Sequence, residues 1–296
     1  VRYVPVKLVD VAGLIPGSHK GKGLGNQFLT DMAEQASALI HVIDASGSRD
    51  SEGKMVGPGT HDPLEDVKFL ERELDLWFLE ILKRDWARIS TRVEAEKKSL
   101  ASLLLDKLSG LGVSGSDISA AIAKSGLKPD KPKNWNEEEL GSFASTLRKV
   151  SKPMLIAANK IDLEPAGSNF QRLKNVLGDY SVIPVCSLGE YALRKLADNE
   201  VISYNPGDRD FSILKPEKLT DRDKESLTRL KREVLDKYGS TGVQETIDKA
   251  VFGLLNMIYV FPVEDPNNYA DHEGRVLPDV FLVPRGTTPK ELAYVV

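Results

Sequence analysis

The stretch "KPMLIAANKID", residues 152–162, decides the fold. Its apolar part, residues 153–158, is a short uninterrupted apolar run of the length typical of a strand that is buried on both faces. The run ends in the polar turn residues Asn159, Lys160 and Asp162. Ligands of open α/β sheets bind outside the carboxyl ends of the strands. Together with the strand–helix–strand order of residues 4–44, the stretch predicts a parallel α/β sheet with a binding site at residues 159–162.

These three polar residues have the spacing NKxD, which suits the recognition of guanine. The Asp162 carboxylate would accept from the N1–H and the exocyclic amine of the base. Asn159 would bridge the base to a neighbouring loop, and the Lys160 stem would cover the ring. Adenine presents no such pair of donors, so the motif favours GTP by hydrogen-bond complementarity. The alternative is an ordinary strand-to-helix turn, because Asn, Lys and Asp are common turn residues.

A second apolar strand, "YSVIPVCS", follows at residues 180–187. It ends in Cys186 and Ser187, whose small side chains would let a backbone N–H reach the oxygen of guanine. The pair carries this meaning only because it follows the NKxD turn in the chain.

The stretch "VPVKLVDVAGLIPG", residues 4–17, contains a third candidate element. Its β-branched alternation predicts a strand over residues 4–11, and Asp10 and Gly13 form a DxxG pattern after it. Asp10 would hold Mg²⁺ through a water molecule, and the Gly13 N–H would approach a γ-phosphate. An isolated DxxG occurs by chance in a chain of this length, so its weight comes from its place between a strand and a glycine-rich loop. No GxxxxGK[ST] phosphate loop is present.

The rest of the chain divides into a helical part and two returns of the α/β pattern. An apolar stripe at helical spacing begins at Pro63, and residues 63–149 are expected to be largely helical. Asn136 and Glu139 resemble a capping box. The other expected elements are a helix at 26–38, a strand at 39–44, a loop at 46–62, helices at 221–237 and 243–257, and a small β-rich end that starts at 257–263.

Composition fits an ordinary soluble protein, with 41% hydrophobic and 28% charged residues among 296. No apolar run approaches the ~20 residues that span a bilayer. A single cysteine and no signal-like N-terminus favour the cytoplasm and exclude an internal disulfide framework. The net charge of −4 argues against a general affinity for polyanions. A local basic face would comprise Lys83, Arg84, Arg88, Arg92, Lys97 and Lys98, although acidic residues are interspersed with them.

Several segments together resemble the Obg-like, YchF-type GTPases in their archaeal form. They are "VKLVDVAGLIPGSHKGKGLGNQFL", "ASALIHVIDASG", "HDPLEDVKFLERELD", "KPMLIAANKID", "YGSTGVQETI" and "LPDVFLVPRGTTPKELAYVV". The resemblance implies a P-loop NTPase G domain at 1–62 and 150–255, a helical, coiled-coil-like insertion at 63–149, and an incomplete TGS domain of β-grasp type at 256–296. It also implies a P-loop upstream of Val1, so the chain alone is expected to hydrolyse GTP poorly.

In function, the resemblance implies a Mg²⁺-dependent switch that hydrolyses GTP to GDP and phosphate and works with the ribosome or its RNA. Leu14 stands where Ras-like enzymes carry a water-orienting Gln. His61 is the candidate catalytic residue that the resemblance implies, with His19 as the other. Two alternatives stay open: an ATP-hydrolysing member of the same family, and a non-catalytic module that binds RNA or ribosomes.

Overall fold

The structure is a computed structural model that describes residues 4–11, 32, 35–265, 267–277 and 279–294. Gly13, Leu14 and His19, and the helix expected at 26–38 apart from a few positions, lie outside the described residues.

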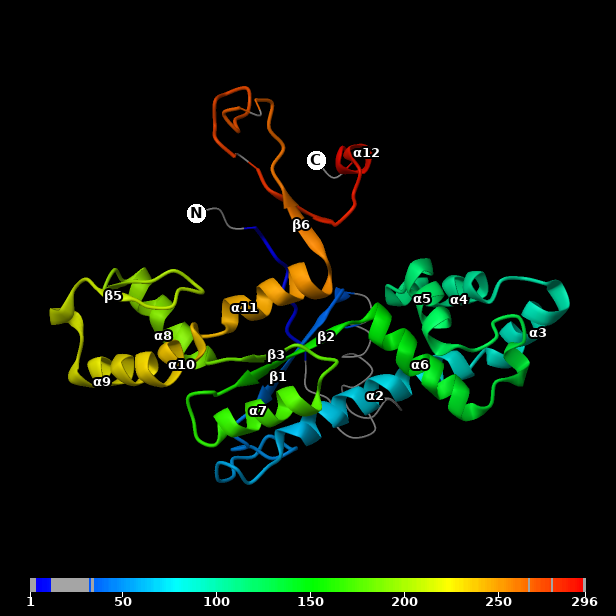
Figure 1. Ribbon diagram of the computed structural model, residues 1–296, viewed down its shortest axis with the longest axis horizontal. Coiled ribbons are helices and arrows are strands. Elements are labelled where there is room, and N and C mark those ends of the chain that lie inside the picture. Colours follow the sequence, from blue (N-terminus) through cyan, green and yellow to red (C-terminus); the bar gives the residue numbers. More distant parts are fainter. Residues whose placement is uncertain (1–3, 12–31, 33–34, 266, 278, 295–296) are drawn as a thin grey trace.

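A parallel sheet of three strands forms the centre of the molecule, as expected for an α/β fold (Figure 1). The strands β1 (Leu39–Asp44), β2 (Met154–Asn159) and β3 (Val182–Pro184) lie in the order β1-β2-β3. The β1–β2 register runs from Leu39 opposite Met154 to Asp44 opposite Asn159. Because both strands are parallel, their last residues meet at the same edge of the sheet.

Helices cover both faces of the sheet, which explains why β2 is apolar from Met154 to Ala158. On one face, the side chains of Met154 and Ile156 pack with residues of α2 (Pro63–Lys83) and α7 (Ala166–Val176). On the other face, Leu155 and Ala157 pack against Ala250 of the π-helical η6 (Lys249–Leu254), which continues α11 (Val243–Asp248). The alternation of side chains along a strand sends neighbouring residues to opposite faces.

Helices occupy almost all of residues 63–151, as the apolar stripe predicts, and they share one apolar core. The stripe does not form one long helix, because the chain turns after α2 and again at Lys97, whose φ is 56°. The predicted capping box of Asn136 and Glu139 is confirmed. The further elements of this part are α3 (Trp86–Glu96), α4 (Leu100–Leu108), η2 (Ser109–Leu111), α5 (Gly115–Ser125), η3 (Pro132–Asn134) and α6 (Glu137–Ser151).

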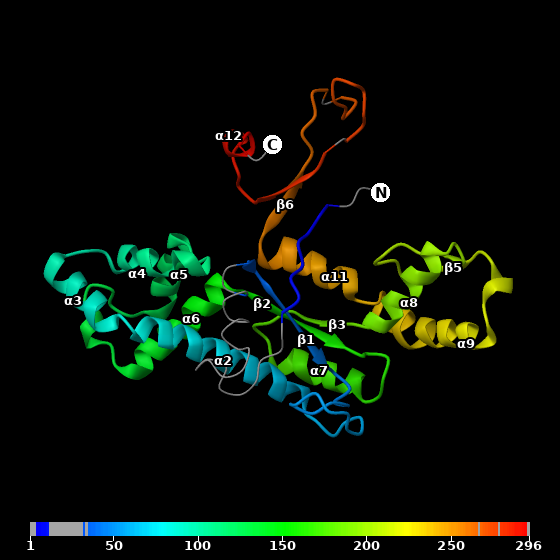
Figure 2. The same cartoon turned by 180° about the vertical axis from the view of Figure 1, so that it is seen from behind.

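Two further groups of elements follow β3. Figures 1 and 2 place α8 and α9 at one end of the sheet, α3 to α5 at the opposite end, and the β6–β7 hairpin projecting from the middle. The elements are α8 (Ser187–Asp198), β4 (Ile202–Ser203), β5 (Ser212–Ile213), η4 (Pro216–Lys218), α9 (Asp221–Leu230), η5 (Lys231–Leu235), α10 (Asp236–Tyr238), β6 (Met257–Val260), β7 (Phe281–Pro284) and α12 (Pro289–Leu292).

The strand expected at residues 4–11 is wrong, since these residues have no regular secondary structure. A strand needs a hydrogen-bonded neighbour, and within the described residues the sheet has only the order β1-β2-β3. The side chains of Val6, Leu8 and Val9 are accordingly exposed. Among the described helices, none is long and apolar enough to cross a bilayer.

A buried arginine joins the helices to the sheet. Arg148 of α6 is fully buried, and its Nε donates to Asp75 Oδ1 of α2 at 2.8 Å. Its Nη2 donates to Glu71 Oε1 at 3.3 Å. Glu71 also accepts from the hydroxyl of Tyr180, a residue that lies just before β3. A buried guanidinium needs such partners, because desolvating its charge is costly. These contacts therefore fix α2 and α6 relative to the sheet.

Removing one partner from this cluster is expected to destabilise the fold. Asp75→Ala should lower the free energy of unfolding by about 3 kcal/mol, because Arg148 would remain buried without its closest counter-charge. Denaturant unfolding followed by circular dichroism measures this change. The matched control is Glu52→Ala, which removes the exposed Lys54–Glu52 pair and should cost less than ~1 kcal/mol. Equal effects of the two variants would contradict the anchoring role of Arg148.

Candidate nucleotide-binding site

The ends of β1 and β2 bring Asp44 and Lys160 together. Lys160 Nζ donates to Asp44 Oδ2 at 2.8 Å and to Ser48 Oγ at 3.0 Å. Asp44 also accepts from the hydroxyls of Ser46 at 2.6 Å and Ser48 at 2.7 Å. The backbone of Lys160 is left-handed, with φ of 62°, which is uncommon for a residue other than glycine. The contacts hold the lysine stem in one orientation along the sheet edge.

The acidity of Asp44 reflects these contacts. Burial raises the pKa of its carboxyl, but the hydrogen bonds from Lys160, Ser46 and Ser48 outweigh burial and bring the pKa to about 2. The carboxylate is therefore charged at neutral pH, and the Asp44–Lys160 pair persists as an ion pair.

Asn159 connects the two polar turns. Its Oδ1 accepts from the Ser187 backbone N–H at 3.1 Å and from the Ser187 hydroxyl at 2.9 Å. Ser187 is the first residue of α8, where backbone N–H groups have no partner inside the helix. The Asn159 side chain thus caps the N-terminus of α8, at the sheet edge where Lys160 also lies.

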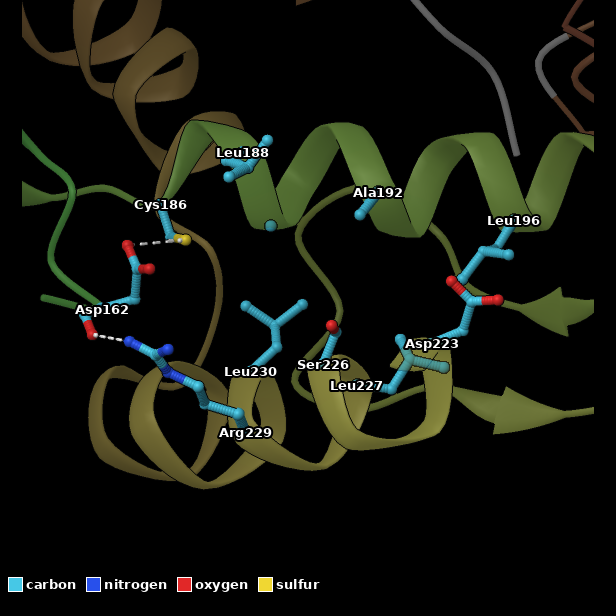
Figure 3. Close-up of a pocket in the computed structure, with 11 residues that line it drawn as sticks. Asp162, Cys186, Leu188, Ala192, Leu196, Asp223, Ser226, Leu227, Arg229 and Leu230 are labelled. Carbon is cyan, nitrogen blue, oxygen red and sulfur yellow. Dashed lines mark hydrogen bonds between the residues drawn. The ribbon is translucent and has the colours of Figure 1, made fainter. Parts of the chain in front are cut away.

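Asp162 and Cys186 form the next contact along this edge. Cys186 Sγ donates to Asp162 Oδ1 at 3.3 Å, and Arg229 donates to the Asp162 carbonyl at 3.3 Å, as Figure 3 shows. Burial raises the pKa of the Cys186 thiol to about 12, so the sulfur keeps its proton and remains a donor. One oxygen of Asp162 is therefore fixed by the thiol, while the second accepts no hydrogen bond from the described residues.

A cavity of about 300 Å³ adjoins this contact between α8 and α9 (Figure 3). Asp162, Cys186 and Arg229 lie at one end of it, and leucines form much of the remainder. A mostly apolar cavity with a few convergent polar groups is the usual form of a small-molecule site.

The structure brings five of the sequence-predicted residues to one edge and leaves the others apart. The five are Asn159, Lys160, Asp162, Cys186 and Ser187. Asp10 is exposed in the segment 4–11, and no hydrogen bond or ion pair of the described residues joins it to the five. His61 Nε2 forms a hydrogen bond with Asp66 Oδ1 at 2.8 Å, and its catalytic role stays a prediction.

Sequence reasoning missed Asp44 and Ser48, which hold Lys160. The signal for them was available, because "LIHVIDASGS" is another apolar strand that ends in polar residues. It also missed α8, although "SLGEYALRKLAD" has helical spacing directly after the second polar turn.

Several known proteins that are similar to this chain are named GTP-binding proteins. The sequence profile described as "Obg-like GTPase YGR210-like, G4 motif-containing domain" matches residues 157–265. A GTP-binding protein of Methanocaldococcus jannaschii is 45% identical over 99% of this chain and 72% of its own length. The crystal structure of a GTP-binding protein from Pyrococcus horikoshii OT3 is 40% identical, with a TM-score of 0.71 over 90% of this chain and 70% of that one. The ribosome-binding ATPase YchF of Haemophilus influenzae is 27% identical over 67% of this chain and 52% of its own length.

The Asp44–Lys160 pair predicts a specific pH dependence of stability. Because the pKa of Asp44 is lowered to about 2 from 3.8, its stabilising contribution is complete above the unfolded-state value and is lost as the pH falls from about 4 to 2. Thermal unfolding of the wild type and of Asp44→Asn should therefore differ most at pH 5 to 7 and converge towards pH 2. The control Asp179→Asn, at an exposed position, should show no such convergence. A difference that grows with acidification would contradict the charged pair.

Proposed function

Because the chain belongs to the Obg-like GTPases of the YGR210 and YchF type, we propose that it binds GTP through the edge formed by residues 159–162 and 186–187. We propose further that the protein hydrolyses GTP to GDP and phosphate as a Mg²⁺-dependent switch, and that it acts on ribosomes in the cytoplasm.

The observation that carries the proposal is the meeting of Asp162, Asn159 and the Ser187 amide at one edge. Guanine presents two donors, N1–H and the exocyclic amine, beside one acceptor, O6. A carboxylate next to a backbone N–H is the complement of that pattern. The thiol of Cys186 holds one Asp162 oxygen, so the carboxylate reaches the base already oriented. Orientation before binding reduces the entropy that binding must lose.

Lys160 has a separate part in this proposal. Its ammonium group is engaged by Asp44 and Ser48, so its methylene stem, rather than its charge, is left to lie against a ring. Apolar contact with a base face is indifferent to the identity of the base. Specificity for guanine would therefore rest on Asp162, and affinity would be shared between the two residues.

For the phosphates and the metal, we propose Asp10 as a ligand of Mg²⁺ through water. Mg²⁺ is usually held by one or two carboxylates together with waters and substrate phosphates, rather than by a cage of protein ligands. The exposed Asp10 carboxylate fits that requirement, and the described residues contain no cluster of three or more His, Cys, Asp or Glu that would form a cage. Bound Mg²⁺ would neutralise phosphate charge during transfer.

Action on ribosomes is supported by the name of the YchF relative and not by the basic residues of this chain. Lys83 contacts Glu137, Arg88 contacts Asp85, and Lys98 contacts Glu96, so much of the expected basic face is neutralised by acidic neighbours. The same relative is named an ATPase, which makes ATP the second candidate substrate. The carboxylate of Asp162 favours GTP, since adenine offers it no matching pair of donors.

Substitution of Asp162 tests whether this residue recognises guanine. In the full-length natural protein, Asp162→Asn should weaken GTP binding by about 100-fold, because two hydrogen bonds to a charged acceptor are lost. Xanthosine triphosphate should become the preferred ligand, since xanthine carries a carbonyl where guanine carries the amine. Titration calorimetry with GTP, ATP and xanthosine triphosphate measures both effects. The control Asp198→Asn, at an exposed position of α8, should bind as the wild type does. Unchanged GTP preference in Asp162→Asn would refute the assignment.

Substitution of Asp10 tests whether this residue contributes to the Mg²⁺ site. Asp10→Ala in the full-length protein should lower Mg²⁺-dependent GTP hydrolysis by at least about tenfold, because the metal would lose its carboxylate partner. GDP binding measured in the presence of a chelator should stay as in the wild type. Phosphate release at several Mg²⁺ concentrations provides the measurement. A variant with wild-type turnover at every Mg²⁺ concentration would exclude Asp10 from the metal site.

A further inference from the structure

The turn "YGSTG", residues 238–242, touches the loop that carries Ser187, although nothing in the proposed function uses it. The Cys186 backbone N–H donates to the Thr241 carbonyl at 2.9 Å. Thr241 is completely buried, so this contact is shielded from water. The turn thus takes up one of the backbone donors at the start of α8.

Gly242 makes this close approach possible. Its φ is +78°, and a Cβ atom placed on it would lie 1.9 Å from the carbonyl oxygen of Pro184. No side chain fits at that distance, and left-handed φ favours glycine independently. The turn is therefore pressed against the last residue of β3, directly before the polar loop.

A buried carboxylate holds the turn in this place. Glu190 of α8 is 4% exposed, and its Oε2 accepts from the Thr241 hydroxyl at 2.6 Å and from the Tyr204 hydroxyl at 2.7 Å. Its other oxygen accepts from Arg194 Nε at 2.5 Å. We call these four residues the Glu190 junction. A buried carboxylate with several donors is costly to disturb, so the junction fixes three segments of the chain to one another.

These contacts determine which backbone amide can face a bound base. Two successive N–H groups, those of Cys186 and Ser187, stand at the start of α8. The Cys186 N–H donates to the buried Thr241 carbonyl, whereas the Ser187 N–H donates to the Asn159 side chain at the site edge, from which a bound base would take it over. If the Thr241 turn moved, the Cys186 amide would be released and the loop would lose the contact that sets the direction of the Ser187 amide.

We propose that Thr241 and Glu190 are positioning residues for guanine recognition, which direct the Ser187 amide, and not that of Cys186, to the O6 atom of the base. This inference rests on the proposed function. It adds that discrimination at O6 is set by a turn more than 50 residues further along the chain, as the 51-residue separation of Glu190 and Thr241 shows.

Two nucleotide analogues separate the parts of the site. In 6-thio-GTP only O6 is changed, to a sulfur that accepts hydrogen bonds weakly, so its binding reports on the Ser187 amide. Inosine triphosphate lacks only the exocyclic amine, so its binding reports on Asp162. In the full-length wild type, GTP should bind about fivefold more tightly than 6-thio-GTP. In Thr241→Val that preference should fall to within about twofold, while the preference for GTP over inosine triphosphate stays unchanged.

The matched control is Tyr204→Phe. It also removes one hydroxyl from Glu190 Oε2, but within the described residues no hydrogen bond joins Tyr204 to Cys186 or Ser187. It should keep both preferences. The variant Thr241→Ser, which retains the hydroxyl, should keep the wild-type preference for GTP over 6-thio-GTP. Should Thr241→Val fail to fold in circular dichroism, Glu190→Gln carries the same test, because it weakens the acceptor of the same hydroxyl.

The outcomes separate the two proposals. A wild type that binds GTP, ATP and both analogues equally would overturn the proposed function and this inference with it. A wild type that discriminates, together with a folded Thr241→Val that keeps its full preference over 6-thio-GTP, would overturn the positioning role alone. Equal loss of both preferences in Thr241→Val and Tyr204→Phe would also overturn it, because that pattern indicates general loosening of the site.

Discussion

The parallel register of β1 and β2 is the constraint on which the candidate site depends. It sets Asp44 opposite Asn159, and so places the Asp44 carboxylate 2.8 Å from the amine of Lys160, 116 residues away in sequence. A slip of one residue would send each side chain of β2 to the other face and separate the two polar ends. The register is specified by the fit of the side chains, because Met154 and Ile156 pack with α2 and α7 on one side, whereas Leu155 and Ala157 pack with η6 on the other. Packing in the centre of the sheet therefore decides the chemistry at its edge.

The long helical segment between β1 and β2 does not disturb this register. The entropic cost of closing a loop grows only slowly with its length. A large insertion therefore lowers the free energy of unfolding only slightly if its residues form a hydrophobic core of their own. Residues 63–151 do so, and the buried Arg148 joins them to Tyr180 through Glu71. On the other side of the sheet, the Glu190 junction ties the start of α8 to Thr241. The two polar clusters lie at different places, that of Arg148 near the amino-terminal ends of β2 and β3, and the Glu190 junction beside the carboxyl end of β3, close to Ser187. Each contains a carboxylate that is satisfied by side chains from distant parts of the chain.

Much of the fold could be predicted from local patterns, and the failures have physical reasons. The apolar runs predicted the strands at 39–44 and 154–159, and the spacing of Asn136 and Glu139 predicted a helix start that the structure confirms. The strand at 4–11 failed because alternation describes the residues of a strand and not the partner that it needs. The grouping of Asn159 with Ser187 was foreseeable, since both end parallel strands. The roles of Asp44, Glu190 and Thr241 were not, because contacts over such separations depend on tertiary packing that no local pattern contains.

The central claim is that guanine is read by the Asp162 carboxylate together with the Ser187 amide. The most direct measurement is the ¹H–¹⁵N spectrum of the isotopically labelled, deuterated protein during titration with GDP and, separately, with ADP. The account predicts that GDP shifts the Ser187 amide strongly, because its hydrogen bond passes from Asn159 Oδ1 to O6 of the base, and leaves the Cys186 amide on Thr241 nearly unchanged. ADP should shift neither in this way. A Ser187 amide that does not respond to saturating GDP, or that responds equally to ADP, would contradict the claim.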